Sequence, residues 1–167
     1  YIRTAGMVLD EAIAKTIEAP KPQKHVARYT DDKRMNRYLG DNRLKLADGS
    51  IVRFSAGGYP RGDVKSISTR EEGFYRVKVS GFAYQSESPI TFSVGATTYR
   101  RGEEEPIFGY FSFTPGQPGK LHTVELTAFM KDRYMIQIEP YGITDPDLGR
   151  RRKAVSYTHL TLPTNRE

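Results

Sequence analysis

A two-residue alternation of apolar and polar side chains in the middle of the chain constrains the fold most. Tyr75, Val77 and Val79 are separated by charged and polar residues. Successive side chains of a strand point to opposite faces, so this alternation predicts a strand with one buried face. The same pattern recurs in residues 90–94, 121–129 and 134–141.

Further short segments of β-type sequence lie between Gly/Pro-rich turns, with no helical pattern between them. The predicted strands cover residues 51–54, 64–69, 74–83, 89–94, 97–100, 107–114, 121–129 and 134–141. This spacing favours an all-β fold, namely an antiparallel, jelly-roll-like β-sandwich over residues 44–143. A body of about 100 residues is long enough for a two-sheet core.

The flanking segments have other patterns. Apolar residues between Ile2 and Ile17 recur about every 3.6 residues, which predicts an amphipathic helix over residues 1–19. We expect this helix to belong to or pack on a missing upstream domain, with packing on the β body as the second choice. Residues 20–43 are predicted to be a linking arm with a short helix near residues 31–39, and residues 144–154 a basic linker. The chain is therefore predicted to be an internal fragment of a larger protein.

Charge and composition argue against several classes of function. The net charge is +6, but Arg150, Arg151, Arg152 and Lys153 supply four of those charges in one run, which indicates a solvated linker. We therefore predict no nucleic-acid partner. No run approaches the roughly 20 apolar residues of a membrane-spanning helix. Cysteine is absent, so disulfides, thiolate zinc sites and cysteine nucleophiles are excluded.

The sequence contains no recognisable catalytic motif. It has no Gly-x-Ser-x-Gly and no His-Glu-x-x-His, and His25 and His122 are predicted to be exposed polar residues. The carboxylates of residues 103–105 are predicted to be solvated loop charge. The fragment is therefore predicted not to be an enzyme. Calcium is the one cofactor for which loop ligands are available, without EF-hand spacing, in Asp31, Asp32, Asp41, Asn42, Asp48 and Asp63.

Aromatic residues give the main indication of a ligand. The chain has 11 Tyr and 8 Phe but no Trp, enough to fill a core and leave rings outside. Exposed rings stack on the apolar face of a sugar while polar neighbours bind its hydroxyl groups. The alternative for each tyrosine is a ring that caps a sheet edge. The predicted ligand-binding residues are Tyr59, Tyr84, Gln85, Tyr99, Arg100, Arg101 and Tyr110.

The C-terminal segment has no compositional relation to the rest of the chain. Residues 155–164 read Val-Ser-Tyr-Thr-His-Leu-Thr-Leu-Pro-Thr, and their back-translation resembles the transposon-end adapter of sequencing libraries. The resemblance implies that residues 155–167 are an artefact of an environmental sequence read. We expect this segment to be disordered.

Other segments resemble a protein family. Residues 1–12, 73–86, 108–116 and 138–142 are similar to large planctomycete cytochrome-like proteins assembled from domains of unknown function. The resemblance implies a secreted or periplasmic protein with a β-sandwich insert similar to carbohydrate-binding modules, and c-type haem elsewhere in some members. No Cys-x-x-Cys-His is present, so haem attachment is not transferred to this chain.

These observations predict a non-catalytic module of an exported multidomain protein that binds polysaccharide or docks against neighbouring domains. One alternative is a structural spacer without a ligand. Another is an accessory part of a redox enzyme or hydrolase whose active site lies outside the fragment.

Overall fold

The computed structural model describes residues 23–31, 39, 43–54, 62–117, 119–141 and 154–164, the last segment through its backbone alone. The described residues form strands and one short 3-10 helix, η1 (Tyr29–Asp31). The strands are β1 (Gln23–Ala27), β2 (Arg43–Lys45), β3 (Ile51–Arg53), β4 (Gly73–Tyr84), β5 (Ile90–Thr97), β6 (Ile107–Phe113), β7 (His122–Met130), β8 (Met135–Pro140) and β9 (Ala154–Thr164). The predicted all-β class is confirmed for this part of the chain.

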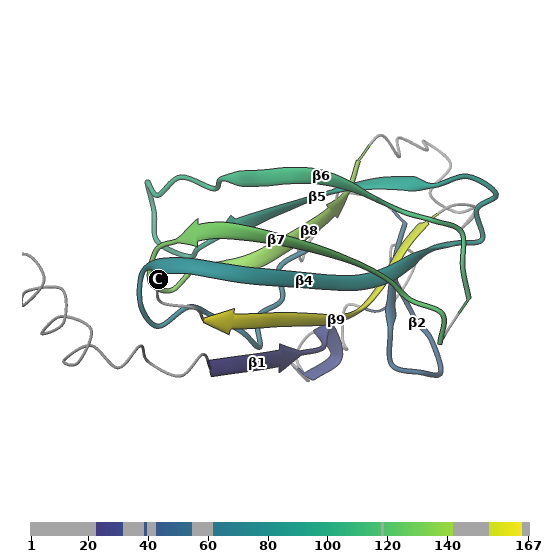
Figure 1. Ribbon diagram of the computed structural model, residues 1–167, viewed down its shortest axis with the longest axis horizontal. Coiled ribbons are helices and arrows are strands. Elements are labelled where there is room, and N and C mark those ends of the chain that lie inside the picture. Colours follow the sequence, from purple (N-terminus) through teal and green to yellow (C-terminus); the bar gives the residue numbers. More distant parts are fainter. Residues whose placement is uncertain are drawn as a thin grey trace, which may run out of the picture.

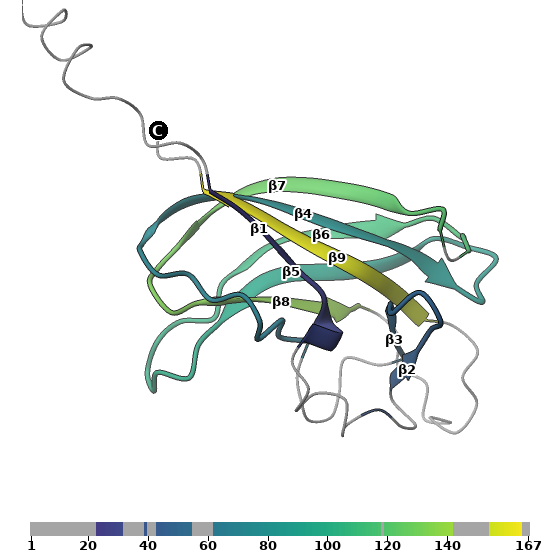
Figure 2. The same ribbon diagram turned by 90° about the horizontal axis from the view of Figure 1, so that it is seen from below.

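The strands form two antiparallel sheets. Sheet A has the order β2-β3-β9-β4-β7, with β1 also paired to β9, and sheet B has the order β6-β5-β8. From β6 to β9 successive strands alternate between the sheets (Figure 1). Figure 2 shows the two sheets as layers, with β4 and β7 in one and β5 and β8 in the other. In sheet A, Gln23 pairs with Thr164, so the first residue of β1 lies beside the last residue of β9.

The core lies between the sheets and is built from every second residue of the alternating strands. Phe92 and Phe113 of sheet B stack with ring centroids 4.3 Å apart. Each fully buried side chain of this size contributes roughly 1.5–3 kcal/mol to folding. The alternation therefore both forms the strands and holds the layers together. The completely or almost completely buried core residues include Val77, Val79, Phe92, Val94, Ile136 and Ile138.

Two segments outside residues 44–143 also join the sheets. Residues 23–27, expected in a linking arm, form β1, and residues 154–164 form β9 between β3 and β4. The structure thus differs from the expected disorder of residues 155–167. The physical reason is that β4 has two edges whose backbone groups need partners, and a segment rich in Val, Tyr and Thr is suited to pair with the second edge.

Two strand boundaries differ from the prediction as well. The expected break between the strands of residues 89–94 and 97–100 is absent, because β5 continues through a register shift between Val94 and Gly95 as far as Thr97. A Cβ atom at Gly95 would lie 2.6 Å from the carbonyl oxygen of Pro106, so glycine is used here for close approach rather than for a turn. Residues 64–69, expected as a strand, instead follow a single bridge between Asp63 and Gln137 and enter a turn.

Some predictions lie outside the described residues. These are the helix over residues 1–19, most of the short helix near residues 31–39, the basic linker up to residue 153 and Tyr59. Within the described part of the chain, no helix has the length and apolar character needed to cross a membrane.

Candidate functional site on the outer face of sheet B

The outward face of sheet B carries tyrosine, hydroxyl, amide and carboxylate side chains. Tyr110 of β6 lies opposite Ser93 of β5, and Ser93 lies opposite Glu139 of β8. Residues directly opposite one another in neighbouring strands share a face, so these three side chains form a row across the sheet. The neighbouring row contains Thr91 and Ser112, whose hydroxyl groups are 3.2 Å apart. We call this surface the tyrosine face.

Two tyrosines form a pair at one side of this face. The rings of Tyr110 and Tyr141 are 4.9 Å apart with an interplanar angle of 64°. Their exposed fractions are 54% and 60%. The backbone N–H of Tyr141 donates a hydrogen bond of 2.9 Å to the carbonyl of Thr91, which fixes Tyr141 next to β5. The two rings are therefore not coplanar but edge-to-face. A ligand can stack on the face of one ring, which forms a platform, and contact the other ring from the side.

Glu139 is held in place from two directions. The side-chain amide of Gln137 donates to Glu139 Oε1 at 2.9 Å. Arg53 Nη2 of β3 lies 3.6 Å from the same oxygen, and the Arg53 side chain is 1% exposed. A buried guanidinium is retained where it is paired and hydrogen-bonded. The Glu139 carboxylate is thus oriented by groups that the fold itself fixes.

A third tyrosine, Tyr99, lies on the far side of Gln137. Asp63 is bridged to Gln137 in an antiparallel pair, so the two share the tyrosine face. The hydroxyl of Tyr99 lies 3.4 Å from Asp63 Oδ2. Lys65 Nζ lies 3.7 Å from the same carboxylate oxygen and 5.3 Å from the centre of the Tyr99 ring. Cross-strand neighbours therefore lead from Tyr110 to Asp63, and Asp63 contacts Tyr99, which is 73% exposed.

Glycine allows the Asp63 segment to lie against β8. The carbonyl of Gly62 accepts a hydrogen bond of 3.0 Å from the N–H of Ile138. A Cβ atom at residue 62 would lie only 1.8 Å from the Ile138 carbonyl oxygen. Only glycine fits at this distance, so Gly62 positions Asp63 beside Gln137.

Of the predicted ligand-binding residues, Tyr99 and Tyr110 both lie along the tyrosine face. Tyr84 and Gln85 lie elsewhere. Tyr84 ends β4 in sheet A, where its ring packs at 6.4 Å from that of Phe54. Gln85 follows in a turn with a positive φ of 48°. Since β5 connects this end of the sandwich to the end that carries Tyr99, the two ends are roughly 23 Å apart. Tyr84 is thus a ring that packs at the end of a strand.

The two predicted arginines lie near Tyr99 but differ in their contacts. Arg100 donates to both carboxylate oxygens of Asp132 at 2.9 Å each. Arg101 is exposed in the turn that follows. Arg100 therefore ties the loop after β5 to the turn between β7 and β8, and its guanidinium is already used for that contact.

Sequence reasoning missed Tyr141, Glu139, Gln137 and Ser93 as ligand-binding candidates. Gln137, Glu139 and Tyr141 are spaced by two residues, opposite in phase to the buried Ile136 and Ile138. That spacing alone places the three on the outward face of one strand. The two-residue spacing that identifies the buried core therefore also identifies these outward-facing residues.

The acidic residues that the structure describes do not gather into a cation site. Among the described residues, no group of three or more His, Asp or Glu side chains could hold a metal ion. In the acidic loop, Glu103 accepts a hydrogen bond of 2.9 Å from Lys131, and Glu105 accepts one of 2.6 Å from the Thr97 hydroxyl. The hydrogen bond from Lys131 is the main cause that lowers the pKa of Glu103. The acidic loop is thus fixed by the contacts of Glu103 with Lys131 and of Glu105 with Thr97.

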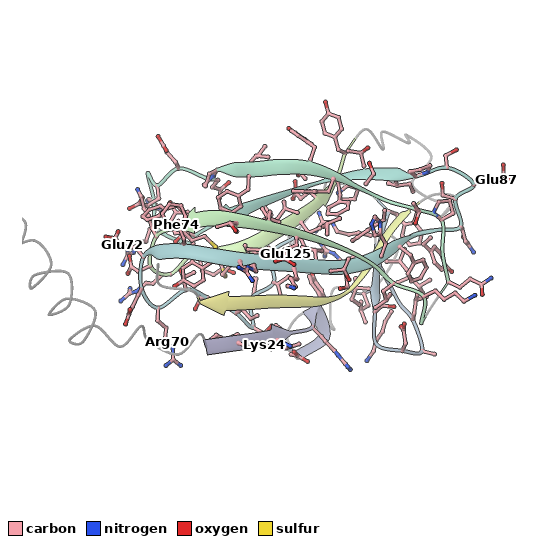
Figure 3. The ribbon with its side chains drawn as sticks, viewed as in Figure 1. Lys24, Arg70, Glu72, Phe74, Glu87 and Glu125 are labelled. Atoms are coloured by element: carbon pink, nitrogen blue, oxygen red, sulfur yellow. The ribbon has the colours of Figure 1, made fainter. Side chains whose placement is uncertain are left out.

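Sheet A carries an aromatic pair on its outward face too, but in other surroundings. Phe74 and Phe129 lie 5.3 Å apart at 70° and are 59% and 49% exposed. Beyond them along the sheet, Glu125 contacts both Arg76, at 3.3 Å, and Lys78, at 2.7 Å. Figure 3 shows Phe74 near one end of β4 and Glu125 farther along the sheet. This pair has the ring geometry of the tyrosine pair, but its neighbours on the sheet are Thr127 and the charged group around Glu125.

No family model matches the chain, and no curated protein matches it. Solved structures that are similar include a xylan-binding CBM22-1 domain from Paenibacillus barcinonensis Xyn10C, at 6% identity and a TM-score of 0.47, covering 89% of this chain and 99% of that one. Another is the carbohydrate-binding module CBM6cm-2 from Cellvibrio mixtus lichenase 5A in complex with cellotriose, at 8% identity and a TM-score of 0.44, covering 89% and 91%. The globular domain of zebrafish complement 1qA protein is similar at 12% identity and a TM-score of 0.40, covering 66% and 75%. None of these likenesses assigns a ligand to the chain.

Proposed function

We propose that this chain is a non-catalytic β-sandwich module that binds carbohydrate through the tyrosine face. One observation carries the proposal: the exposed Tyr110–Tyr141 pair lies on a face whose other side chains are Ser93, Glu139 and Gln137. A sugar ring has an apolar face of C–H groups and a rim of hydroxyl groups. An aromatic platform surrounded by hydroxyl, amide and carboxylate groups matches both.

The fixed contacts of the face support binding rather than catalysis. Glu139 is oriented by Arg53 and Gln137, so it can accept hydrogen bonds from sugar hydroxyls without first being ordered. A glycosidase would need a second carboxyl group about 5–10 Å away across the scissile bond. The next carboxylate on the face, Asp63, is 6% exposed and contacts Lys65. It is a structural partner in this arrangement and not a proton donor aimed at a substrate.

The proposal includes export of the parent protein, in agreement with the family resemblance. Structural polysaccharides lie outside cells, so a module that binds them has to be exported. Docking against neighbouring domains and a spacer without a ligand remain the alternatives. A binding experiment with the full chain decides among the three.

A glycan array probed with the full chain, with and without calcium, tests the proposal. We expect binding to a defined set of polysaccharides, and we expect Tyr110→Ala to weaken it about tenfold, since losing roughly 1.4 kcal/mol of ring contact corresponds to that factor. Phe74→Ala is the matched control, because it removes one ring of an equally exposed pair on the other sheet. We expect that variant to bind like the unchanged protein.

Three outcomes would contradict the proposal. The first is flat binding over the whole array, which would favour the spacer. The second is equal weakening by Tyr110→Ala and Phe74→Ala, which would indicate nonspecific adhesion through exposed rings. The third is weakening by Phe74→Ala alone, which would move the binding surface to sheet A.

A further inference from the structure

We propose that the ligand is an extended, uncharged polysaccharide chain that crosses the tyrosine face diagonally, with Tyr99 as a second stacking platform. This inference rests on the proposed carbohydrate function and adds the second contact, the direction and the charge class of the ligand. It is carried by the series of cross-strand neighbours from Tyr110 to Asp63 and by the contact between Asp63 and Tyr99.

The length of this series requires a ligand of more than one sugar unit. From Tyr110 to Asp63 the path crosses three strand spacings, from β6 through β5 and β8 to the segment of residues 62–64. At 4.7–4.9 Å per spacing this is roughly 14 Å, and the shift of two residues along the strands adds roughly 7 Å in the perpendicular direction. Asp63, which contacts the hydroxyl of Tyr99, is therefore about 16 Å from Tyr110 along the diagonal. A single sugar ring on the Tyr110–Tyr141 pair does not reach Tyr99.

Tyr99 has the properties of a preorganised platform. Its hydroxyl is directed to Asp63, and the Lys65 ammonium lies over its ring, so two contacts fix the side chain. At the same time 73% of the residue is exposed. Since Lys65 covers only one side of the ring, the other side is accessible for stacking. Fixing a ring before binding reduces the entropy lost when the ligand binds.

The charges along the diagonal favour an uncharged ligand. The Glu139 carboxylate faces Arg53, and the Asp63 carboxylate faces Lys65, so each charge on the path has an opposite charge beside it. Arg100, the cation next to Tyr99, is in a two-fold contact with Asp132. Selecting an anionic polysaccharide requires cations whose field is not already compensated. This face offers hydrogen-bonding groups with compensated charge, which suits neutral hydroxyl groups.

Calorimetric titration with oligosaccharides of increasing length tests the inference. The probes are dimers to hexamers of β-1,4-linked glucose and of β-1,4-linked xylose, with galacturonic acid oligomers of the same lengths as anionic comparators. Oligomers prepared from the neutral polysaccharide with the strongest array signal complete the set. We expect the affinity for neutral oligomers to rise with length until both platforms are occupied. We expect the galacturonic acid oligomers to bind at least tenfold more weakly.

Two variants separate the platforms. Tyr99→Ala should weaken the longest neutral oligomers about tenfold and leave the dimers unchanged, whereas Tyr110→Ala should weaken all lengths. Phe74→Ala, which removes an exposed ring on the other sheet, is the control and should bind normally at every length. Circular dichroism of each variant verifies that it is folded.

The outcomes distinguish this inference from the function on which it rests. Binding of neutral oligomers that Tyr99→Ala leaves unchanged at every length would overturn the second platform, while the proposed function would stand. Tighter binding of the galacturonic acid oligomers would overturn the neutral class. If no oligomer and no array glycan binds, both the inference and the proposed function are overturned.

Discussion

Glu139 illustrates how one residue of the tyrosine face depends on distant parts of the chain. It lies in β8, its partner Arg53 lies in β3 of the other sheet, and its neighbour Gln137 is bridged to Asp63. Arg53 is buried, so its charge has to be compensated inside the protein. The same carboxylate that we expect to bind sugar hydroxyls therefore also stabilises the contact between the sheets.

Replacement of Glu139 tests this stabilising role. Glu139→Ala removes a carboxylate from a buried guanidinium, and we expect the free energy of unfolding to fall by about 1–3 kcal/mol in urea titrations. Glu125→Ala is the control, because Glu125 contacts Arg76 and Lys78 on the exposed side of sheet A. We expect that change to cost about 0–1 kcal/mol. Equal losses for the two variants would show that Arg53 does not depend on Glu139.

At the scale of elements, the loop after β5 is fastened to the turn between β7 and β8. Lys131 of the turn donates to Glu103 at 2.9 Å, and the hydroxyl of Tyr134 donates to the carbonyl of Glu104 at 2.7 Å. Burial is the main cause that raises the pKa of Tyr134. Because Tyr99 begins this loop, these contacts also determine how firmly the second platform is held.

The Glu103 contact makes the loop sensitive to acid. The hydrogen bond from Lys131 lowers the pKa of Glu103 below its ordinary value of 4.5. A carboxyl group with a lowered pKa contributes its stabilisation above the ordinary value and loses it as the pH falls through the lowered one. We therefore expect the full stabilisation of the loop above pH 4.5, and we expect the amide protection factors of residues 98–106 to fall as the pH drops through the lowered pKa of Glu103.

An NMR titration of the Glu103 carboxyl carbon measures this effect directly. Lys131→Met should bring the pKa of Glu103 back up towards 4.5, because it removes the hydrogen bond and the positive charge. It should also remove the fall in the amide protection factors of the loop at acidic pH. A Glu103 carboxyl that titrates at or above 4.5 in the unchanged protein would contradict the prediction.

The sequence alone predicted those strands in which apolar and polar residues alternate. Over residues 75–79 of β4, 90–94 of β5 and 136–140 of β8 every second residue is buried, and the alternation in the sequence is sufficient to see it. β1 reads Gln-Lys-His-Val-Ala and has no such alternation, so only its pairing with β9 makes it a strand. Pairing between distant segments is not visible in a local pattern, and this is why β1 and β9 were missed.

The candidate site was predictable to a similar degree. Tyr99 and Tyr110 were identified because exposed rings at strand ends and outward positions are visible in the sequence. Their placement on one face depends on the register of β5 with β6 and β8 and on the bridge to Asp63. That register follows from packing across the whole sandwich, so the sequence alone does not supply it.

At the scale of the whole molecule, β9 joins two parts of sheet A. β1 and β3 both pair with β9, and β9 pairs with β4. Within the described residues, no pairing connects β1 or the β2–β3 hairpin to β4 or β7 directly. The stability of that half of the sheet therefore depends on the segment that resembles a sequencing adapter.

Deletion of residues 154–167 tests whether this segment belongs to the fold. If it does, we expect the midpoint of thermal unfolding to fall by at least about 2–4 °C, since that is the shift caused by a loss of about 1 kcal/mol in a protein of this size. Hydrogen exchange should accelerate in β1, β2 and β3 and remain slow in β5 and β8. An unchanged midpoint and unchanged exchange would support the view that the segment is an artefact.

The pairing of Gln23 with Thr164 has a consequence for the way such a sandwich is connected to other polypeptides. The backbone enters β1 and leaves β9 at neighbouring points at one end of sheet A. A short Gly/Ser bridge between these points would allow circular permutation, with new ends opened in a distant turn. For the same reason the sandwich can be inserted into a surface loop of a host domain without forcing the two sides of that loop apart.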